Sequence, residues 1–138
     1  MGEGIQKDDL SKEVKILEQT VSIGDIGLGD QKIFNILAPV RDLTIKKIGV
    51  SASSDITAAD TNYMTVAVKN GSDTVASFAT GPASGGQSFT AGTIVWLTLN
   101  PDYLSMERAT DELTVVVDKQ GNGLAADGLT FHLVLEMA

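Results

Sequence analysis

Apolar and polar side chains alternate with a two-residue period over much of this sequence from about residue 17 onward. The alternation is clearest near the C-terminus, where Phe131, Leu133 and Leu135 alternate with His132, Val134 and Glu136. Such alternation, together with β-branched and aromatic residues, favours strands with one buried face. We expect about eight strands, at 17–23, 32–37, 42–53, 63–69, 74–80, 93–99, 112–118 and 129–137.

Turn residues separate these segments and indicate the fold class. The strongest hairpin signal is Asn70-Gly71, because this dipeptide tolerates positive φ between the strands at 63–69 and 74–80. The same turn explains the apparent glycosylation acceptor Asn-Gly-Ser. No long helical period is present, although residues 8–17 offer a weak helix as an alternative. Short, regularly spaced strands predict an all-β fold, an antiparallel two-sheet sandwich of the jelly-roll kind.

The pattern also divides the chain and marks one irregularity. Residues 1–13 are polar, contain glycine and lack a sustained period, so we expect a flexible N-terminal arm before a β-sandwich domain at 14–138. Within 42–53 the apolar phase slips by one residue at Lys46 and Lys47. That slip indicates either a β-bulge or an edge strand protected by two lysines.

Composition narrows the classes of partner. The chain has 18 acidic and 10 basic residues and a net charge of −8, which repels nucleic acid and anionic lipid. It has no cysteine, which excludes disulfides, thiolate metal ligands and cysteine nucleophiles. No apolar stretch approaches the ~20 residues that span a bilayer, and no signal-peptide pattern opens the sequence. We therefore expect neither nucleic acid nor membrane as a partner.

Candidate chemistry is sparse. His132 is the only histidine and lies on the polar face of its predicted strand, without a second histidine to complete a transition-metal site. The nucleophile-elbow pattern G-x-S-x-G is absent. The glycines at 24–29 follow the order G-x-x-G-x-G, which favours a loop over a dinucleotide site. We expect no enzyme activity and no cofactor.

One segment has part of a calcium-binding pattern. Residues 118–123 place Asp118, Asn122 and a glycine as at the start of a calcium loop, and Asp127 follows. The twelfth position is Leu129, where a bidentate glutamate is needed, and the flanking segments are predicted strands. A hairpin loop is therefore favoured, and no metal site is predicted.

Aromatic residues leave a binding alternative open. Trp96, with Tyr63 or Tyr103, could stack against a sugar ring if the side chains were exposed. Trp96 lies within the apolar run IVWLTL, so a core position is the favoured interpretation.

Three segments carry a resemblance to a known group of proteins. They are ITAADTNYMTVAVKNGSDTVASFAT at 56–80, FTAGTIVWLTLNPDYLSMERATDELTVVVDKQGNG at 89–123 and LTFHLVLEMA at 129–138. Together they resemble small structural proteins of tailed bacteriophages, of the capsid-decoration or head-fibre type. The resemblance implies a jelly-roll-like sandwich without cofactors that binds the major capsid protein on the outside of the head as a symmetric oligomer, commonly a trimer. The implied location is the virion surface, after assembly in the host cytoplasm.

The arm suggests how such binding would work. About 13 extended residues reach ~45 Å, which is enough to cross a neighbouring subunit. We expect apolar contacts, or a strand added to a neighbour's sheet, from Ile5, Leu10, Val14, Ile16 and Leu17. Two other classes remain open: a carbohydrate- or ligand-binding module of a fibre or collar adhesin, and a small β-barrel enzyme with a pocket at His132.

Overall fold

The computed structural model describes residues 15–26, 32–39, 41–108, 110–121 and 126–137, and the predicted arm lies outside them. The described residues form strands and one short 3-10 helix, η1. In chain order they are β1 (Lys15–Ile26), β2 (Lys32–Leu37), β3 (Leu43–Ser51), β4 (Tyr63–Asn70), β5 (Asp73–Ala79), β6 (Val95–Trp96), η1 (Pro101–Tyr103), β7 (Ser105–Met106), β8 (Leu113–Gln120) and β9 (Ala126–Met137).

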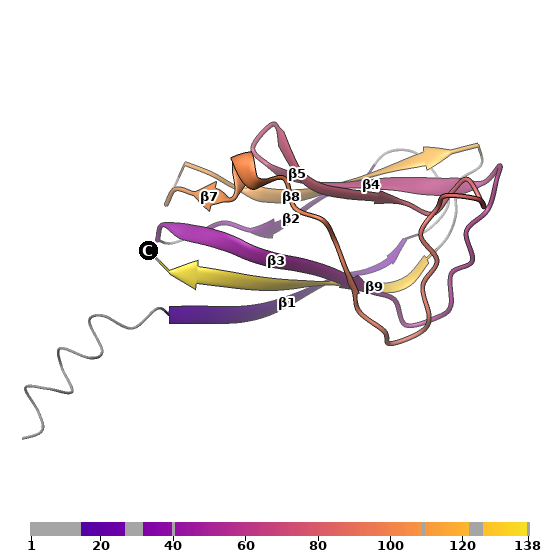
Figure 1. Ribbon diagram of the computed structural model, residues 1–138, viewed down its shortest axis with the longest axis horizontal. Helices are drawn as coiled ribbons and strands as arrows, with labels where there is room; N and C mark the ends of the chain where they lie inside the picture. The colour runs from indigo at the N-terminus through magenta and orange to yellow at the C-terminus, as the bar shows by residue number, and fades with distance from the viewer. Residues whose placement is uncertain (1–14, 27–31, 40, 109, 122–125, 138) are drawn as a thin grey trace, which may run out of the picture.

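The strands form two antiparallel sheets that stack face to face (Figure 1). The five-stranded sheet has the order β1-β9-β3-β6, with β7 also pairing β3, and the four-stranded sheet has the order β2-β8-β4-β5. The predicted all-β two-sheet sandwich is confirmed. The predicted segments at 17–23, 32–37, 63–69 and 129–137 all lie within strands of this sandwich.

The order of pairing is that of a jelly roll. β1 pairs β9, β2 pairs β8, β3 pairs β6 and β7, and β4 pairs β5, as in one long hairpin whose tip is at Gly71. Pairing of β9 with β3 and of β8 with β4 rolls that hairpin into two sheets. β6 and β7 share one strand position, because both pair with β3.

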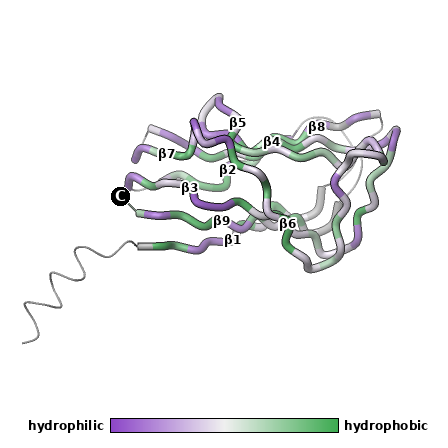
Figure 2. Tube along the Cα trace, viewed as in Figure 1, coloured by the Kyte–Doolittle hydropathy of each residue, from purple (hydrophilic) through white to green (hydrophobic). Residues whose placement is uncertain are grey.

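Inward-facing side chains of the two sheets fill the interior. In the four-stranded sheet, β4 alternates buried and half-buried residues along its whole length, as the two-residue period requires. Hydrophobic stretches run along the long strands, interrupted by hydrophilic ones in β1 and β3, and hydrophilic residues are frequent in the loops (Figure 2). The most deeply buried large side chains include Phe131, Leu133, Leu135, Ile45, Ile48, Val50, Met64, Val66, Val68 and Leu113.

The phase slip in β3 is a bulge. The register against β9 shifts between Ile45 and Lys47, and the shift lets Ile45 and Ile48 both face the core while the two lysines stay exposed. β3 lies between β9 and β6, so the edge-strand alternative for the two lysines is wrong.

The Asn70-Gly71 hairpin forms as predicted. Gly71 has φ of 64°, and Asn70 pairs with Asp73 across the turn. The Asn70 side chain is buried, and its Nδ2 donates to the backbone oxygens of Tyr103 and Ser105 at 3.2 and 2.9 Å. This amide fastens the hairpin to the segment around η1, so it is not free to accept a glycan.

Two local expectations differ from the structure. Only Val95–Trp96 of the predicted strand at 93–99 pairs as β6, and the chain turns into η1 at Pro101, which lacks the N–H that a sheet ladder needs. The second concerns residues 118–123, where a hairpin was expected. β8 and β9 belong to different sheets, so this connection crosses the sandwich and the hairpin interpretation is wrong.

Candidate binding surfaces

Large apolar side chains that remain exposed fall into two groups. Among the described residues they are Ile16, Leu17, Ile33, Ile94 and Trp96. The first three lie on β1 and β2, and the last two lie in and beside β6. We name the first group the open side and the second the Trp96 groove.

The open side is the side of the sandwich formed by β1 and β2, which are each the edge strand of one sheet. In the described residues β1 pairs only with β9 and β2 pairs only with β8, so each strand has one unpaired edge. The two strands also contact each other across the sandwich, which places both unpaired edges on the same side. Ile16 is 52% exposed, Leu17 42% and Ile33 62%.

The open side contains part of the predicted contact set. Ile16 lies opposite Glu136 and Leu17 opposite Leu135, so the two neighbours point to opposite faces of the sheet. Ile33 was not predicted as a contact residue, because the sequence placed residues 32–37 in a strand but did not show that this strand lies at the edge of a sheet. The other predicted contact residues, Ile5, Leu10 and Val14, lie outside the described residues.

The Trp96 groove lies on the outward face of the five-stranded sheet. The register places Thr20, His132, Gly49 and Trp96 in one row across β1, β9, β3 and β6. At Gly49 an ideal Cβ would lie only 2.8 and 2.9 Å from two ring carbons of Trp96, so the indole rests on the glycine backbone. The Nζ of Lys47 lies 5.4 Å from the ring centroid, within cation–π distance.

Beside the indole the surface is hollowed by about 200 Å³. Trp96 and Ile94 form one wall, β9 contributes the floor, and β1 forms the opposite wall. The lining includes Glu18, Thr20, Ile94, Trp96, His132 and Val134. It therefore combines one aromatic surface with a carboxylate, a hydroxyl and an imidazole.

His132 takes part in a hydrogen bond on this face. Its Nε2 lies 2.8 Å from the Oγ of Ser51 on β3, which orients the ring. The predicted position of His132 on the outward face is confirmed. No group of three or more potential ligands from His, Cys, Asp and Glu comes together in the described part of the chain. Asn122 and the side chain of Asp127 lie outside the described residues, and Asp118 lies on β8.

The favoured interpretation of Trp96 as a core residue is wrong, since its side chain is 49% exposed. The period that governs the other strands explains this. Val95 and Leu97 pack against the core, so Trp96 between them must point outward with Thr98. The alternation in residues 93–99 indicated an outward position for Trp96, whereas the hydrophobicity of the segment suggested a core position.

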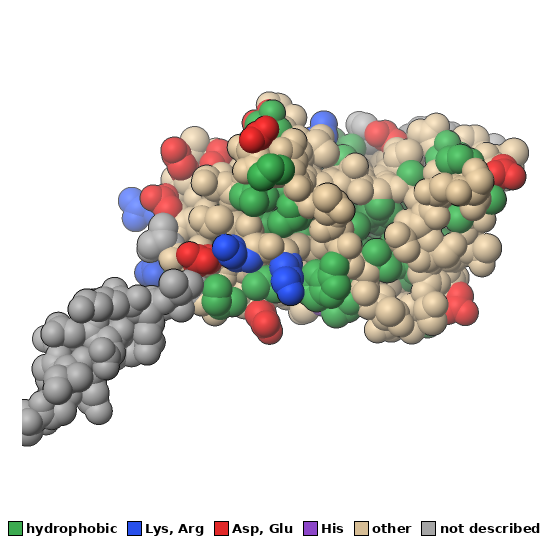
Figure 3. All heavy atoms as spheres, in the orientation of Figure 1, with side chains coloured by type: hydrophobic (Ala, Val, Ile, Leu, Met, Phe, Trp, Pro, Cys, Tyr) green, Lys and Arg blue, Asp and Glu red, His purple; other side chains and the backbone are tan. Residues whose placement is uncertain are grey.

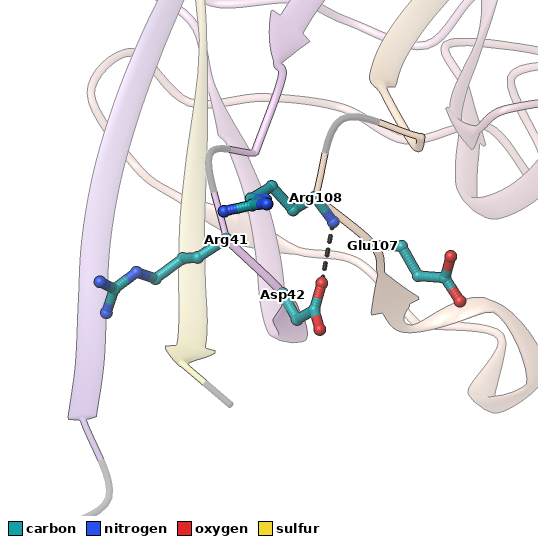
Figure 4. A pocket seen from close by; sticks show the side chains of 4 residues that line it. All are labelled: Arg41, Asp42, Glu107 and Arg108. Carbon is teal, nitrogen blue, oxygen red and sulfur yellow. Dashed lines mark hydrogen bonds between the residues drawn. The ribbon is translucent and has the colours of Figure 1, made fainter.

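A larger depression, lined by charged residues, lies at the end of the sandwich. It measures about 690 Å³ and is lined by Arg41, Asp42, Glu107 and Arg108. The backbone N–H of Arg108 donates to Asp42 Oδ1 at 2.9 Å, but the side chains of Arg41 and Glu107 point away from the centre in opposite directions (Figure 4). These charged groups do not converge on a common point.

The face of the molecule drawn in Figure 3 has no dominant charged patch. On this face, acidic side chains are spread mostly around the rim of the sandwich, and basic side chains lie next to exposed hydrophobic ones. The net charge of −8 acts as a general repulsion of anions.

No protein-family model, curated protein or solved structure matches this chain. Among the described residues, no helix has the length and apolar character to cross a membrane. The two surfaces therefore carry the functional argument.

Proposed function

We propose that this chain is a structural virion protein that decorates the outside of a tailed-phage head, with the major capsid protein and further copies of itself as partners. Jelly rolls occur in viral capsid proteins, lectins and cupins, so the fold alone does not select a function. The resemblance of the segments at 56–80, 89–123 and 129–138 to phage structural proteins favours the virion role.

The observation that carries the proposal is the open side. An unpaired strand edge offers backbone donors and acceptors to another strand, and many proteins protect such edges with charged residues or proline. β1 begins with Lys15 and has Asp25 near its end, but between them Glu18 is its one charged residue, and the strand has no proline. This edge is therefore well suited to pairing with a strand from another subunit.

Apolar contacts add to such pairing. Complete burial of one large aliphatic side chain contributes about 1.5–3 kcal/mol, so covering the exposed half of any one of Ile16, Leu17 and Ile33 contributes roughly 1 kcal/mol. Ile16 and Ile33 point outward from different sheets, so they offer two small contacts and not one continuous patch. Contacts of this size correspond to weak binding by a single subunit. A symmetric oligomer makes several such contacts at once, and this multivalency converts weak sites into slow release from a capsid. The proposal extends to Ile5, Leu10 and Val14, which precede β1 in the sequence.

The first experiment measures assembly. The purified chain is examined by light scattering to obtain the mass of the oligomer, for which we expect a trimer, and is then mixed with bare heads of the cognate phage. The double variant Ile16→Lys/Ile33→Lys should lower head occupancy at least tenfold. Thr74→Lys, on the exposed edge strand β5, adds a lysine away from the open side and should bind like the original chain.

Two further measurements separate the parts of this proposal. Deletion of residues 1–12 should lower occupancy if the arm contributes contacts, and unchanged occupancy removes the arm from the proposal. Decorated heads should melt at a higher temperature than bare heads. Equal melting temperatures contradict a stabilising role, and failure of the original chain to bind heads contradicts the proposed function as a whole.

A further inference from the structure

We propose that the Trp96 groove binds one neutral pyranose ring of a glycan. This site is separate from the open side. It lies on the outward face of the five-stranded sheet, and its ligand class follows from the shape and chemistry of its lining.

The indole is held as a preformed platform. Because Gly49 has no side chain, the space under the ring is free for the indole. An ideal Cβ at this position would lie 2.6 Å from the Cγ2 atom of Ile94. Trp96 and Ile94 thus both rest on the backbone at Gly49, and about half of the Trp96 surface is open to solvent. A ring that is already in place loses little conformational entropy when a ligand stacks on it.

The remaining lining matches the hydroxyl groups of a sugar. A pyranose has a C–H face that stacks on an aromatic ring and a rim of hydroxyls that donate and accept hydrogen bonds. Across the groove from Trp96, Glu18 contributes an acceptor and Thr20 a hydroxyl that does both. On the floor, His132 is oriented by its hydrogen bond with Ser51. One aromatic surface facing several polar groups is the combination that this type of ligand requires.

Size and charge limit the ligand further. The hollow of about 200 Å³ equals the share of six or seven liquid water molecules at ~30 Å³ each, which is space for one sugar ring. Adjacent sugars would extend into solvent. Two opposite charges lie at the groove, because Glu18 lines it and the Nζ of Lys47 lies 5.4 Å from the centroid of the Trp96 ring. They offset each other locally, so the net charge of −8 decides, and it favours a neutral ring over acidic sugars and phosphates.

The chain has a built-in reporter, because Trp96 is its only tryptophan. The full chain is titrated with glucose, galactose, mannose and N-acetylglucosamine while tryptophan emission is recorded, and the same chain is applied to an array of neutral and acidic glycans. We expect a saturable change of emission with at least one neutral sugar, at millimolar concentrations.

Substitutions test whether the signal arises from stacking in the groove. Binding by Trp96→Ala, followed by NMR, should weaken at least tenfold, whereas Trp96→Phe should retain part of the affinity. Ile33→Ala removes an exposed apolar side chain from the open side and should leave sugar affinity within twofold. Thr20→Lys obstructs the groove from the opposite wall and should abolish binding without touching the indole.

Three outcomes overturn the inference. The first is the absence of saturable binding by any neutral sugar in both the titrations and the array. The second is unchanged affinity in both Trp96→Ala and Thr20→Lys. The third is a preference for acidic glycans. None of them bears on head binding through the open side, so the two proposals fail separately.

Discussion

Substitution of Gly49 by alanine should displace the indole of Trp96 without unfolding the sandwich, so it tests the position of the ring separately from the stability of the fold. The new Cβ would lie 2.6 Å from Ile94 Cγ2 and 2.8 Å from the nearest ring carbon of Trp96, which is far inside van der Waals contact. Both neighbours are side chains with substantial exposure, so they can retreat outward. We expect the indole to lift from the sheet while the fold persists.

The expected change in stability is small because two effects oppose each other. A fully covered aromatic side chain buries about 150–250 Å², so the covered half of Trp96 amounts to roughly 100 Å², or about 2.5 kcal/mol at 25 cal/mol per Å². A displacement of about 0.5–1 Å forfeits a quarter to a half of such contact, close to 1 kcal/mol. Alanine in a strand recovers about 0.5–1 kcal/mol relative to glycine.

Urea unfolding followed by circular dichroism measures stability independently of the indole, and emission reports on Trp96 directly. Gly49→Ala should change the free energy of unfolding by less than ~1 kcal/mol while shifting emission to longer wavelength and weakening sugar binding. Gly85→Ala is the matched control, because its Cβ meets nothing within 4 Å. Unchanged emission in Gly49→Ala, or a loss above ~2 kcal/mol, refutes the view that Trp96 is a seated surface platform.

Three further substitutions test the sandwich itself. Asn70→Ala leaves two backbone carbonyls without their donor, so the urea midpoint should fall by an amount equivalent to about 1–3 kcal/mol, and an unchanged midpoint contradicts the clamp at the hairpin. Phe131→Ala empties a fully buried position and should cost about 3–5 kcal/mol in thermal unfolding, whereas a loss below ~1 kcal/mol would place that ring outside the core. Lys46→Ala breaks a 3.5 Å ion pair with Glu136 whose lysine side chain is 48% exposed, and denaturant unfolding should change by less than ~0.5 kcal/mol; a loss above ~1 kcal/mol contradicts that assessment.

Local periodicity was sufficient to predict which face of most strands is buried. In β9 and β4 one face meets the core and the other meets solvent, so alternation alone assigns each side chain to a face. The phase slip at Lys46 was also visible locally, because an extra residue must shift the apolar phase, but the choice between a bulge and an edge strand required the position of β3 in its sheet. The sheet membership of β8 and β9 was not visible, because it depends on pairing between strands that are distant in the sequence.

The binding surfaces depended even more on distant pairing. Ile16 and Leu17 could be named from the sequence because they belong to the apolar residues of the leading segment, but the edge position of β2 that exposes Ile33 appears only in the assembled sheet. The seat of Trp96 requires Gly49 on one strand to face an indole on another through the register of β3 and β6. Neither segment contains that information by itself.

β1 links the two proposals physically. Its unpaired edge belongs to the open side, whereas its outward face carries Glu18 and Thr20 into the Trp96 groove. A partner strand added at that edge would extend the five-stranded sheet directly beside the wall of the groove and restrict the motion of β1. When the wall is already ordered, sugar binding costs less conformational entropy, so the sugar affinity rises. By thermodynamic linkage, bound sugar should raise the affinity for the partner strand by the same factor. If both proposals hold, the head-bound chain should bind sugar more tightly than the free chain, although neither Ile16 nor Ile33 of the open side lines the groove.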